Sequence, residues 1–375
     1  MVRSAERPRG GRCEHELAVL RTAAREGAAD PEVVDAIAVR LGNGDGSGWV
    51  REWTAAGGAA WASARSRASA STYLSAASYY AAALALIDQS DGWVDESRLW
   101  DRQRECWDRA VELLGGERLS IAYEGTALPG YFFSAGAGVR PLVVIDHGGR
   151  VATSAAWAAG GAAATARGYH WMTFDGPGRQ AALRRQRLVL RPDWEAALGP
   201  VADAMVARTD VDPSRMAVIG IDHAGYGIGR ALAFEPRFAA AVLAPGVVDA
   251  SRPWLDALPT NARVALSEED RESFDREVHL AGLFAPEIRD RLTDLGRGYD
   301  LSGVPLYDLA RRICEFRLGD EAARITTPVL VCPTGPEPLW AIQAEELCVR
   351  VDGAEQLACD GPDVGRALDW LDSFM

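Results

Sequence analysis

The first third of the chain has the spacing of apolar and polar positions that is typical of helices. From Cys13 to about Leu114, apolar residues recur at intervals of three and four, Pro is rare, and Ala, Leu, Glu and Arg dominate. This spacing predicts about five helices. One of them, over residues 71–87, carries a stripe of Tyr and Leu side chains, a pattern more typical of a packed core than of a ligand-binding wall. We therefore expect residues 1–115 to form a helical domain.

After Gly115 the pattern changes to short apolar runs that alternate with helical stretches. Two strands are expected first, at residues 118–123 and 131–133, around turns that contain Gly and Pro. Alternation of strand and helix predicts the α/β class, with a doubly wound, mostly parallel sheet over residues 116–375. The charged, helical stretch 251–320 lacks a clear strand, and we expect it to form a lid. The later strands are expected over residues 141–145, 170–174, 216–220, 239–243, 329–331 and 355–357.

Composition narrows the classes of partner. The chain has 375 residues, of which 48% are hydrophobic and 25% are charged, as in an ordinary globular protein. Its formal net charge of −13 argues against nucleic acid or an anionic membrane as a partner, because phosphate groups attract clustered Lys and Arg. We expect a small-molecule substrate that is neutral or weakly charged.

Cysteine usage and hydropathy favour a cytoplasmic protein without a cofactor. The six cysteines form no CxxC pair and no Cys/His spacing of the kind that binds zinc, so neither a metal site nor a disulfide framework is predicted. No stretch reaches the roughly 18 apolar residues that a membrane span needs. The basic N-terminus also lacks the apolar run of a signal peptide.

The sharpest local signal lies where the strand predicted over residues 216–220 ends. Asp222 follows this strand at once and precedes a helix, and the small residues Gly220, Ala224 and Gly225 flank it. A nucleophile elbow requires small flanking residues, because its central residue occupies a strained turn between a strand and a helix. The alternative is an ordinary junction in which Asp222 caps the helix.

A second glycine-rich junction, His147-Gly148-Gly149, follows the third predicted strand. In an elbow of this kind, the backbone N–H of the next residue, here His223, points at the reacting centre and can stabilise an oxyanion. The second oxyanion donor is expected from the backbone N–H of Gly149 or Arg150.

Six stretches spread over nearly the whole chain form a further pattern: residues 123–131, 174–178, 191–195, 220–226, 233–237 and 328–340. In combination they resemble an α/β-hydrolase family that includes 2,6-dihydroxypseudooxynicotine hydrolase, a carbon–carbon bond hydrolase, and fungal hydrolases that shorten polyketide chains. The resemblance implies an α/β-hydrolase fold with a helical N-terminal cap. It also implies a homodimer, since relatives with this cap are often dimers.

The resemblance implies a Ser nucleophile at the elbow, an acidic residue after the seventh predicted strand and a His after the last one. This chain departs from all three. Asp222 replaces the serine, Pro333 stands at the position implied for the acid, with Glu337 the one acid left nearby, and Ala358 stands at the position implied for the histidine. No histidine lies beyond His279. Serine hydrolysis needs a base to take the hydroxyl proton, so a triad esterase is excluded.

Three functions remain open. In the first, Asp222 acts as a general acid or base in a closed pocket whose apolar surroundings disfavour its charge, beside donors that stabilise an enolate or phenolate. This hypothesis predicts a non-hydrolytic enzyme of natural-product biosynthesis that catalyses cyclisation, isomerisation or elimination of a polyketide-like or aromatic substrate. In the second, a hydrolase or C–C lyase uses Asp222 as a nucleophile or to activate water. In the third, the chain is an inactive pseudohydrolase that binds a ligand or a partner.

Further candidates accompany Asp222. His147 ends a strand beside the expected oxyanion donors and is a candidate for catalysis or substrate binding. Glu337 and Asp249 both follow strands at the carboxyl edge of the sheet, where open α/β sheets bind ligands, so either is a candidate second acid, but each is also explained as a loop or cap residue. His223 fits packing into the fold better than catalysis. The candidates for oxyanion or substrate contact are Gly149, Arg150, His223, Tyr226, Asp249 and Trp340.

Other polar residues fit structural roles better. Asp146 is expected to hydrogen-bond at the end of a strand, and Asp175, which begins an Asp-Gly-Pro-Gly turn, is expected to scaffold that turn. His170 and His279 lie in apolar or helical surroundings, and we expect both to be structural.

Overall fold

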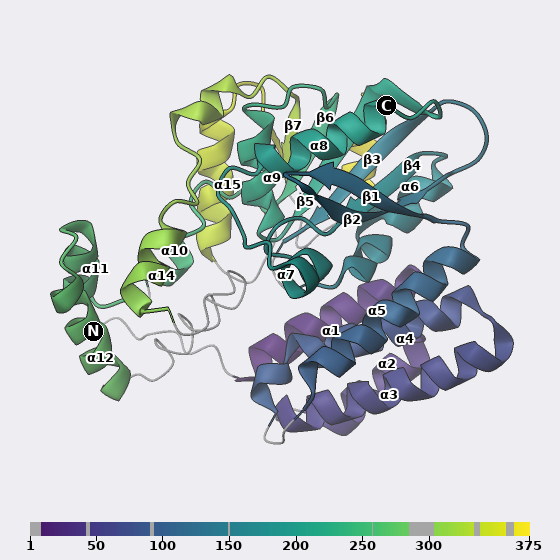
Figure 1. Cartoon of the computed structure of the whole chain (residues 1–375), viewed down its shortest axis with the longest axis horizontal. Coiled ribbons are helices and arrows are strands. Elements are labelled where there is room, and N and C mark those ends of the chain that lie inside the picture. Colours follow the sequence, from purple (N-terminus) through teal and green to yellow (C-terminus); the bar gives the residue numbers. More distant parts are fainter. Residues whose placement is uncertain are drawn as a thin grey trace. The chain divides into compact units, whose positions relative to one another are not determined.

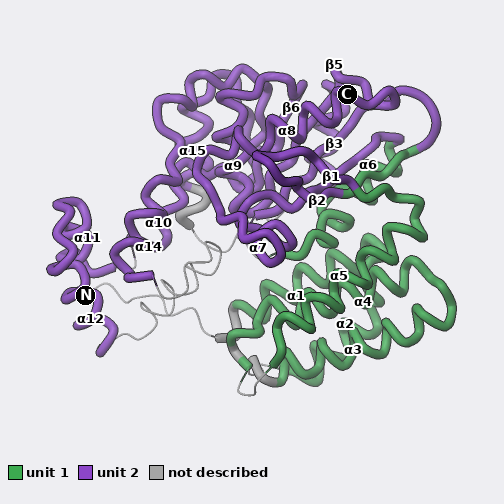
Figure 2. Tube along the Cα trace, viewed as in Figure 1, with its two compact units in different colours: residues 1–118, 131–135, 151–167 green, residues 119–130, 136–150, 168–375 purple. Residues whose placement is uncertain are grey.

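The computed structural model of the chain describes residues 9–42, 46–90, 94–148, 151–256, 258–284, 304–333, 338–357 and 364–375. Its Cα trace divides into two compact units (Figure 2). Unit 1 comprises residues 1–118, 131–135 and 151–167, and unit 2 comprises residues 119–130, 136–150 and 168–375.

The N-terminal part of unit 1 consists of the five predicted helices, with a short 3-10 turn after the fourth (Figure 1): α1 (Arg9–Arg25), α2 (Pro31–Leu41), α3 (Gly46–Arg67), α4 (Ala70–Ala85), η1 (Ile87–Gln89) and α5 (Glu96–Leu113). Asp30, Ser69 and Asp95 cap α2, α4 and α5, each by accepting a hydrogen bond from a backbone N–H of the first turn. The Tyr and Leu side chains at the centre of α4 are buried, so the predicted stripe belongs to the core.

A segment between two strands of the sheet also belongs to unit 1. It forms η2 (Thr153–Ala156), η3 (Trp157–Gly161) and α6 (Ala162–Ala166). Buried hydrogen bonds join it to α5, because Gln103 donates to the Ser154 hydroxyl at 2.9 Å and Arg104 donates to the Thr153 hydroxyl at 3.0 Å. The sequence predicted a helix here, but not its association with the helical unit.

Eight strands form one sheet: β1 (Glu117–Tyr123), β2 (Thr126–Phe133), β3 (Arg140–His147), β4 (His170–Phe174), β5 (Val211–Ile221), β6 (Ala240–Ala244), β7 (Val329–Val331) and β8 (Glu355–Gln356). Their order is β1-β2-β4-β3-β5-β6-β7-β8. Every pairing from β4 to β8 is parallel, so the predicted α/β class with a mostly parallel sheet is confirmed. β1 and β2 are joined by Glu124 and Gly125, whose φ values of 40° and 79° suit a tight two-residue hairpin turn.

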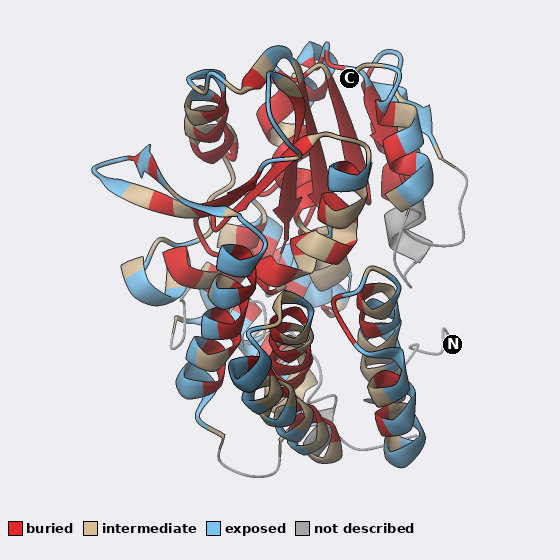
Figure 3. Cartoon of the chain, turned by 90° about the vertical axis from the view of Figure 1, so that its right-hand side faces the viewer, coloured by how far each residue is buried: buried red, intermediate tan, exposed pale blue. Residues whose placement is uncertain are grey.

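The central strands form the core of unit 2 (Figure 3). All residues of β4 and β6, and all but the first of β3, are buried. Such continuous burial is typical of parallel strands that are covered on both faces. Helices α8 (Glu195–Val206) and α9 (Ala224–Leu232) lie against β5 (Figure 1).

The described part of the insertion over residues 251–320 is helical, as predicted. The 3-10 turn η4 (Asp320–Arg324) follows it. No helix within the described ranges is long and apolar enough to cross a membrane. Within its described residues, unit 2 also contains α7 (Gln180–Gln186), α10 (Arg252–Leu255), α11 (Thr260–Ser267), α12 (Arg271–Phe284), α14 (Leu306–Ile313), α15 (Pro338–Arg350) and α16 (Val364–Leu371).

The start of α9 packs closely against the segment after β6. A Cβ atom on Gly225 would lie 1.9 Å from the carbonyl oxygen of Pro245, so this position requires glycine. Later in the same helix, a Cβ atom on Gly229 would meet a Leu243 methyl group at an ordinary 3.5 Å. The first turn of α9 therefore depends on the absence of a side chain at Gly225, whereas the second turn does not depend on one at Gly229.

We predict that Gly225→Ala destabilises the protein by about 3 kcal/mol, because the backbone at Pro245 must move to admit the methyl group. Gly229→Ala is the matched control in the same helix. It should change the free energy of unfolding by less than about 1 kcal/mol, since alanine favours a helix and meets only ordinary contacts here. Urea unfolding followed by circular dichroism measures both variants, and equal stability of the two would contradict the close contact at Gly225.

Candidate active site

Asp222 occupies the turn between β5 and α9 with a φ of 59°, in the left-handed region that non-glycine residues rarely adopt. Its N–H donates to the carbonyl of Ala244 at 2.8 Å, and its carbonyl accepts from the N–H of Gly225 at 2.9 Å, so hydrogen bonds hold this strained backbone. The residue directly before α9 is His223, and no side chain caps the helix. The elbow predicted from the sequence is therefore present, and the alternative of Asp222 as a helix cap is wrong.

The side chain of Asp222 is exposed, and its carboxylate makes no hydrogen bond to the described part of the chain. The sequence predicted a carboxyl group enclosed by apolar residues, and that prediction is wrong for this side chain. A carboxylate in contact with solvent keeps its hydration. It is open to a reactant at the carboxyl edge of the sheet, where ligands of α/β folds bind.

His147 ends β3 beside the elbow, and its backbone pairs with Ile221 in the parallel register. The side chain is buried, and among the described residues neither ring nitrogen has a hydrogen-bond partner. Burial lowers the pKa of His147 to about 4, although the charge of Asp222 opposes this shift. At neutral pH the ring is uncharged, with one N–H donor and one acceptor nitrogen unpaired. Buried polar atoms without partners are rare, so His147 is suited to bind a group that the described part of the chain does not supply.

Gly148 brings the loop after β3 against the elbow. Its N–H donates to the carbonyl of Ile221 at 2.8 Å, and a Cβ atom on Gly148 would lie 2.3 Å from the backbone nitrogen of His223. Only glycine permits this approach. Gly149 and Arg150, which were expected to supply the second oxyanion donor, lie outside the described residues, so that role stays a prediction.

A buried cluster that was not predicted from the sequence lies at the end of β3. Arg179, directly before α7, forms an ion pair with the carboxylate of Asp146. The indole N–H of Trp194 donates to the other carboxylate oxygen at 2.9 Å, and the guanidinium carbon of Arg179 lies 4.1 Å from the centroid of the Trp194 ring. All three side chains are almost fully buried. Asp146 therefore hydrogen-bonds at a strand end as predicted, through partners that the sequence did not reveal.

Glycines make room for the Trp194 ring. A Cβ atom on Gly176 would lie 2.6 Å from the outer edge of the ring, and one on Gly227, in α9, would lie 2.9 Å from its Cγ atom. Gly178 has a φ of 78°, which allows the turn before Arg179. These turn glycines were visible in the sequence. Glycines that make room for a large ring beside an arginine are a sequence signal that could have indicated this cluster.

Arg179 connects the cluster electrostatically to the elbow. Asp146 pairs with Gly220 in the register of β3 and β5, two residues before Asp222. Burial lowers the pKa of Arg179 to about 9, and the negative charge of Asp222 opposes that shift. Arg179 therefore stays cationic at neutral pH. Asp222 interacts with this cation and with the neutral imidazole of His147.

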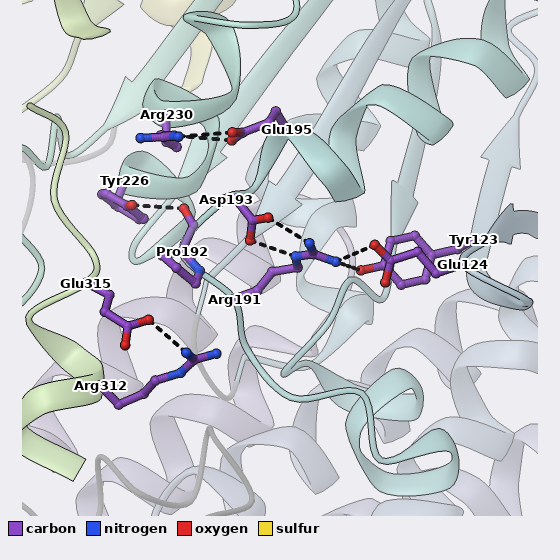
Figure 4. Close-up of polar contacts among 10 residues, drawn as sticks. All are labelled: Tyr123, Glu124, Arg191, Pro192, Asp193, Glu195, Tyr226, Arg230, Arg312 and Glu315. Atoms are coloured by element: carbon purple, nitrogen blue, oxygen red, sulfur yellow. Dashed lines mark hydrogen bonds and ion pairs between the residues drawn. The ribbon is translucent and has the colours of Figure 1, made fainter. Parts of the chain in front are cut away.

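Tyr226, predicted to contact substrate, packs within the fold (Figure 4). The side chain is buried, its ring centroid lies 5.7 Å from that of Phe316, and its hydroxyl donates to the carbonyl of Pro192 at 2.9 Å. Next to that carbonyl, Arg191 donates hydrogen bonds to both carboxylate oxygens of Asp193. It also donates a hydrogen bond to the tyrosine hydroxyl at the end of β1 (Figure 4). Tyr226 thus helps to hold the segment that leads into α8.

Asp249 is a loop-capping residue, which was the alternative left open for it. One carboxylate oxygen accepts hydrogen bonds from the N–H and the hydroxyl of Ser251, and the other lies 3.0 Å from Nε of Arg317. The Asp249 N–H donates to the Gln343 side chain at 2.7 Å. Because both carboxylate oxygens are occupied, Asp249 is not suited to be the second acid.

His170 and Asp175, which were both expected to be structural, form hydrogen bonds with backbone atoms. Nε2 of His170 lies 3.1 Å from the carbonyl oxygen of Asp210, and the carboxylate of Asp175 accepts from the N–H of Ala181 at 3.2 Å. His279 lies within α12, so its surroundings are helical as expected, and its side chain is exposed.

The remaining candidates are only partly described. His223 is half-buried directly before α9. Glu337 and Ala358 lie outside the described residues, and for Trp340 only the backbone, within α15, is described. A second acid at Glu337 and a substrate contact from Trp340 therefore stay predictions.

Comparison with known sequences finds hydrolases. No protein-family model matches the chain. A hydrolase from Fusarium sp is 35% identical over 142 residues, which cover 35% of this chain and 34% of that protein. Hydrolase acrC from Aspergillus aculeatus is 31% identical over 255 residues, which cover 60% of this chain and 59% of that protein. The chain thus matches less than two thirds of the length of these curated relatives.

Solved structures match over almost the whole chain. The structure of 2,6-dihydroxy-pseudo-oxynicotine hydrolase superposes with a TM-score of 0.66 at 18% identity, covering 94% of this chain and 95% of that one. The chain is an α/β-hydrolase-fold protein. A second such structure, AbyA5, has a TM-score of 0.62 at 19% identity over 95% of each chain. The resemblance recognised in the sequence motifs is confirmed, and at these identities the solved structures establish the fold alone.

Burial of neutral His147 should make this α/β-hydrolase fold sensitive to acid. An unfolded His has a pKa near 6.5, whereas that of folded His147 is about 4. Between these values the unfolded state binds more protons, so stability falls as the pH falls. We expect a loss of about 2 kcal/mol in the free energy of unfolding between pH 7 and pH 5 from this residue, measured by urea unfolding.

His147→Gln is the comparison for this effect, because glutamine is polar and does not titrate. The variant should lose about 2 kcal/mol less than the wild type over the same pH interval. An equal loss in both proteins would show that burial does not hold His147 neutral.

We also expect Trp194→Phe to lower the free energy of unfolding by about 2 kcal/mol, because a buried oxygen of Asp146 loses its donor. Trp254→Phe is the comparison within unit 2. Its indole N–H has no partner in the described part of the structure, so the substitution removes no hydrogen bond. Urea unfolding of the two variants tests this, and a Trp194→Phe protein as stable as Trp254→Phe argues against the bond to Asp146.

Proposed function

We propose that this chain is an enzyme that converts a small organic substrate by proton transfer at Asp222 and not by hydrolysis. The reaction class is cyclisation, isomerisation or elimination, and the resemblance to hydrolases of polyketide metabolism favours a polyketide-like or aromatic substrate from natural-product biosynthesis. The observation that carries the proposal is the residue at the elbow. Asp222 presents an open carboxylate beside a buried, neutral histidine that has no hydrogen-bond partner among the described residues, in a chain that lacks the serine and the late histidine of a triad.

The proposed roles follow from the chemistry of each group. Asp222 takes a proton from the substrate and returns it after the bonds have rearranged. His147 donates its neutral ring N–H to the oxygen on which negative charge develops. The backbone N–H of His223, at the positive end of α9, is the second donor.

Proton transfer at Asp222 needs fewer catalytic residues than hydrolysis through an ester does. If Asp222 attacked carbon, the resulting ester would persist until another base activated water. The resemblance would put that base at Ala358, and the acid that orients it at Pro333. An acid–base cycle at Asp222 requires neither residue, and we therefore favour it.

The test starts from a host strain in which the gene has been deleted. The strain should accumulate a compound that the purified protein converts into a product of equal mass, or of a mass reduced by one expelled small molecule. Asp222→Asn keeps the shape of the side chain and removes the base, so we expect the rate to fall by about 100-fold or more. Gly229→Ala, in the helix that follows the elbow, should keep the wild-type rate. Unchanged turnover by Asp222→Asn would rule out the role of Asp222.

A hydrolase or C–C lyase is the second candidate, because the sequence relatives are named hydrolases. Reaction in heavy-oxygen water separates the two. Hydrolysis by directly activated water incorporates the label into the product. If Asp222 attacks carbon and water then hydrolyses the ester, the label enters the Asp222 carboxylate after a single turnover, because the product takes its oxygen from Asp222. Proton transfer labels neither carboxylate nor product. Tight binding without any conversion would instead identify an inactive pseudohydrolase.

A further inference from the structure

We propose that Gln343, in α15, is a substrate-binding residue whose side-chain amide donates a hydrogen bond to an acceptor oxygen of the substrate, such as a carbonyl oxygen. The proposal deepens the proposed function and rests on it for the presence of a substrate at Asp222. The observation behind it is a fully buried glutamine whose amide oxygen is bound twice by the backbone, while its amide nitrogen has no partner among the described residues.

The contacts of the amide oxygen fix the orientation of the Gln343 side chain. Oε1 accepts from the N–H of Val248 at 3.0 Å and from the N–H of Asp249 at 2.7 Å. Because both partners are donors, the amide atom that faces them is the oxygen, and a flipped amide would set donor against donor. The residue is 0% exposed, so Nε2 does not reach solvent. Its two N–H groups are therefore buried and held in one direction.

The polar groups around this contact already have partners within the chain. The carbonyl of Val248 accepts from the N–H of Leu318 at 2.7 Å, and the Asp249 carboxylate is occupied by Ser251 and Arg317. The amide nitrogen, in contrast, has no partner in the described part of the chain. Such buried donors are rare, because the hydration that they lose is not replaced. We infer that a bound molecule supplies the missing acceptor.

The segment that Gln343 binds continues directly from the strand beside the elbow. Ala244, the last residue of β6, accepts the N–H of Asp222 at 2.8 Å, and Val248 follows four residues later. The sheet order places β5 between β3 and β6. His147, at the end of β3, and the segment after β6 therefore lie on opposite sides of the strand that leads to the elbow. Both are at the carboxyl edge of the sheet, where ligands of α/β folds bind.

The chemistry of the amide defines the group that it binds. An amide nitrogen donates hydrogen bonds, carries no charge and cannot accept, so it suits a carbonyl or ether oxygen and does not suit an ammonium group. Gln343 therefore selects a substrate that presents an acceptor oxygen on the β6 side of the elbow. Such an oxygen is present in polyketide-like compounds and in oxygenated aromatic compounds, which are the substrates proposed above.

The test uses acetophenone and 1-phenylethylamine, which share one carbon skeleton but present a carbonyl oxygen and an ammonium group. In Gln343→Glu, a carboxylate accepts from the same two N–H groups, which favour its ionised form, and its second oxygen replaces the donor. Ligand-observed NMR with the full chain at neutral pH measures both dissociation constants. We expect the preference for acetophenone over the amine to fall by about tenfold or more. Gln356→Glu, the same change at an exposed position of β8, is the matched control and should keep the wild-type preference.

A folded Gln343→Glu protein with the wild-type preference overturns the proposal, and so does wild-type protein that binds no acetophenone. If the variant does not fold, the wild type with nitrogen-15 in its glutamine side chains decides. Acetophenone should then shift the amide resonances of Gln343, which are assigned by their proximity to the N–H groups of Val248 and Asp249, and unshifted resonances overturn the proposal. Failure of the proposed function is a separate result, because it appears as Asp222→Asn that still converts the accumulated substrate, whatever acetophenone does.

Discussion

The contact between Trp194 and the Asp146–Arg179 ion pair is the interaction on which the candidate-site edge of unit 2 depends. A buried ion pair pays a large desolvation penalty, and it is stable only when further hydrogen bonds satisfy its remaining polar atoms. The indole N–H satisfies the second oxygen of Asp146, and the indole face covers the guanidinium group of Arg179. This one side chain therefore allows two charges to remain buried at the end of β3.

Two residues of α9 contact residues that precede and follow Trp194 in the chain. Tyr226 binds the carbonyl of Pro192, and Arg230, in α9, binds the carboxylate of Glu195 (Figure 4). The helix that follows the elbow is thus tied to the segment that carries Trp194. Because Asp146 precedes His147 directly, the same contacts also fix the end of β3 beside the elbow.

The elbow combines a strained backbone with two different electrostatic environments. Asp222 is held at a φ of 59° by hydrogen bonds and by the close approach of α9, yet its carboxylate is open to solvent. His147, one strand away, is buried and neutral at pH 7. Two neighbouring polar side chains of the candidate site therefore lie in different surroundings, one exposed and one buried. The fold supplies the position, whereas the residues placed there decide the chemistry.

The sequence by itself determined the elements and the elbow. Helical spacing in the first third of the chain, apolar runs after Gly115 and small residues around Asp222 are local signals, and each corresponds to a local feature of the structure. The replacement of the catalytic serine and the absence of a late histidine were equally readable, since they are properties of single positions. These features could be predicted because backbone geometry and periodicity act over a few residues.

Only the tertiary structure decided which side chains meet. It paired Arg179 with Asp146 across 33 residues, joined Trp194 to the same carboxylate across 48, and occupied Tyr226 and Asp249 with structural contacts. It also left Asp222 exposed, where the sequence had suggested enclosure, and brought the segment after β3 into the helical unit. Burial and charge pairing depend on the packing of segments that are distant along the chain, and such contacts leave no periodic trace in the sequence.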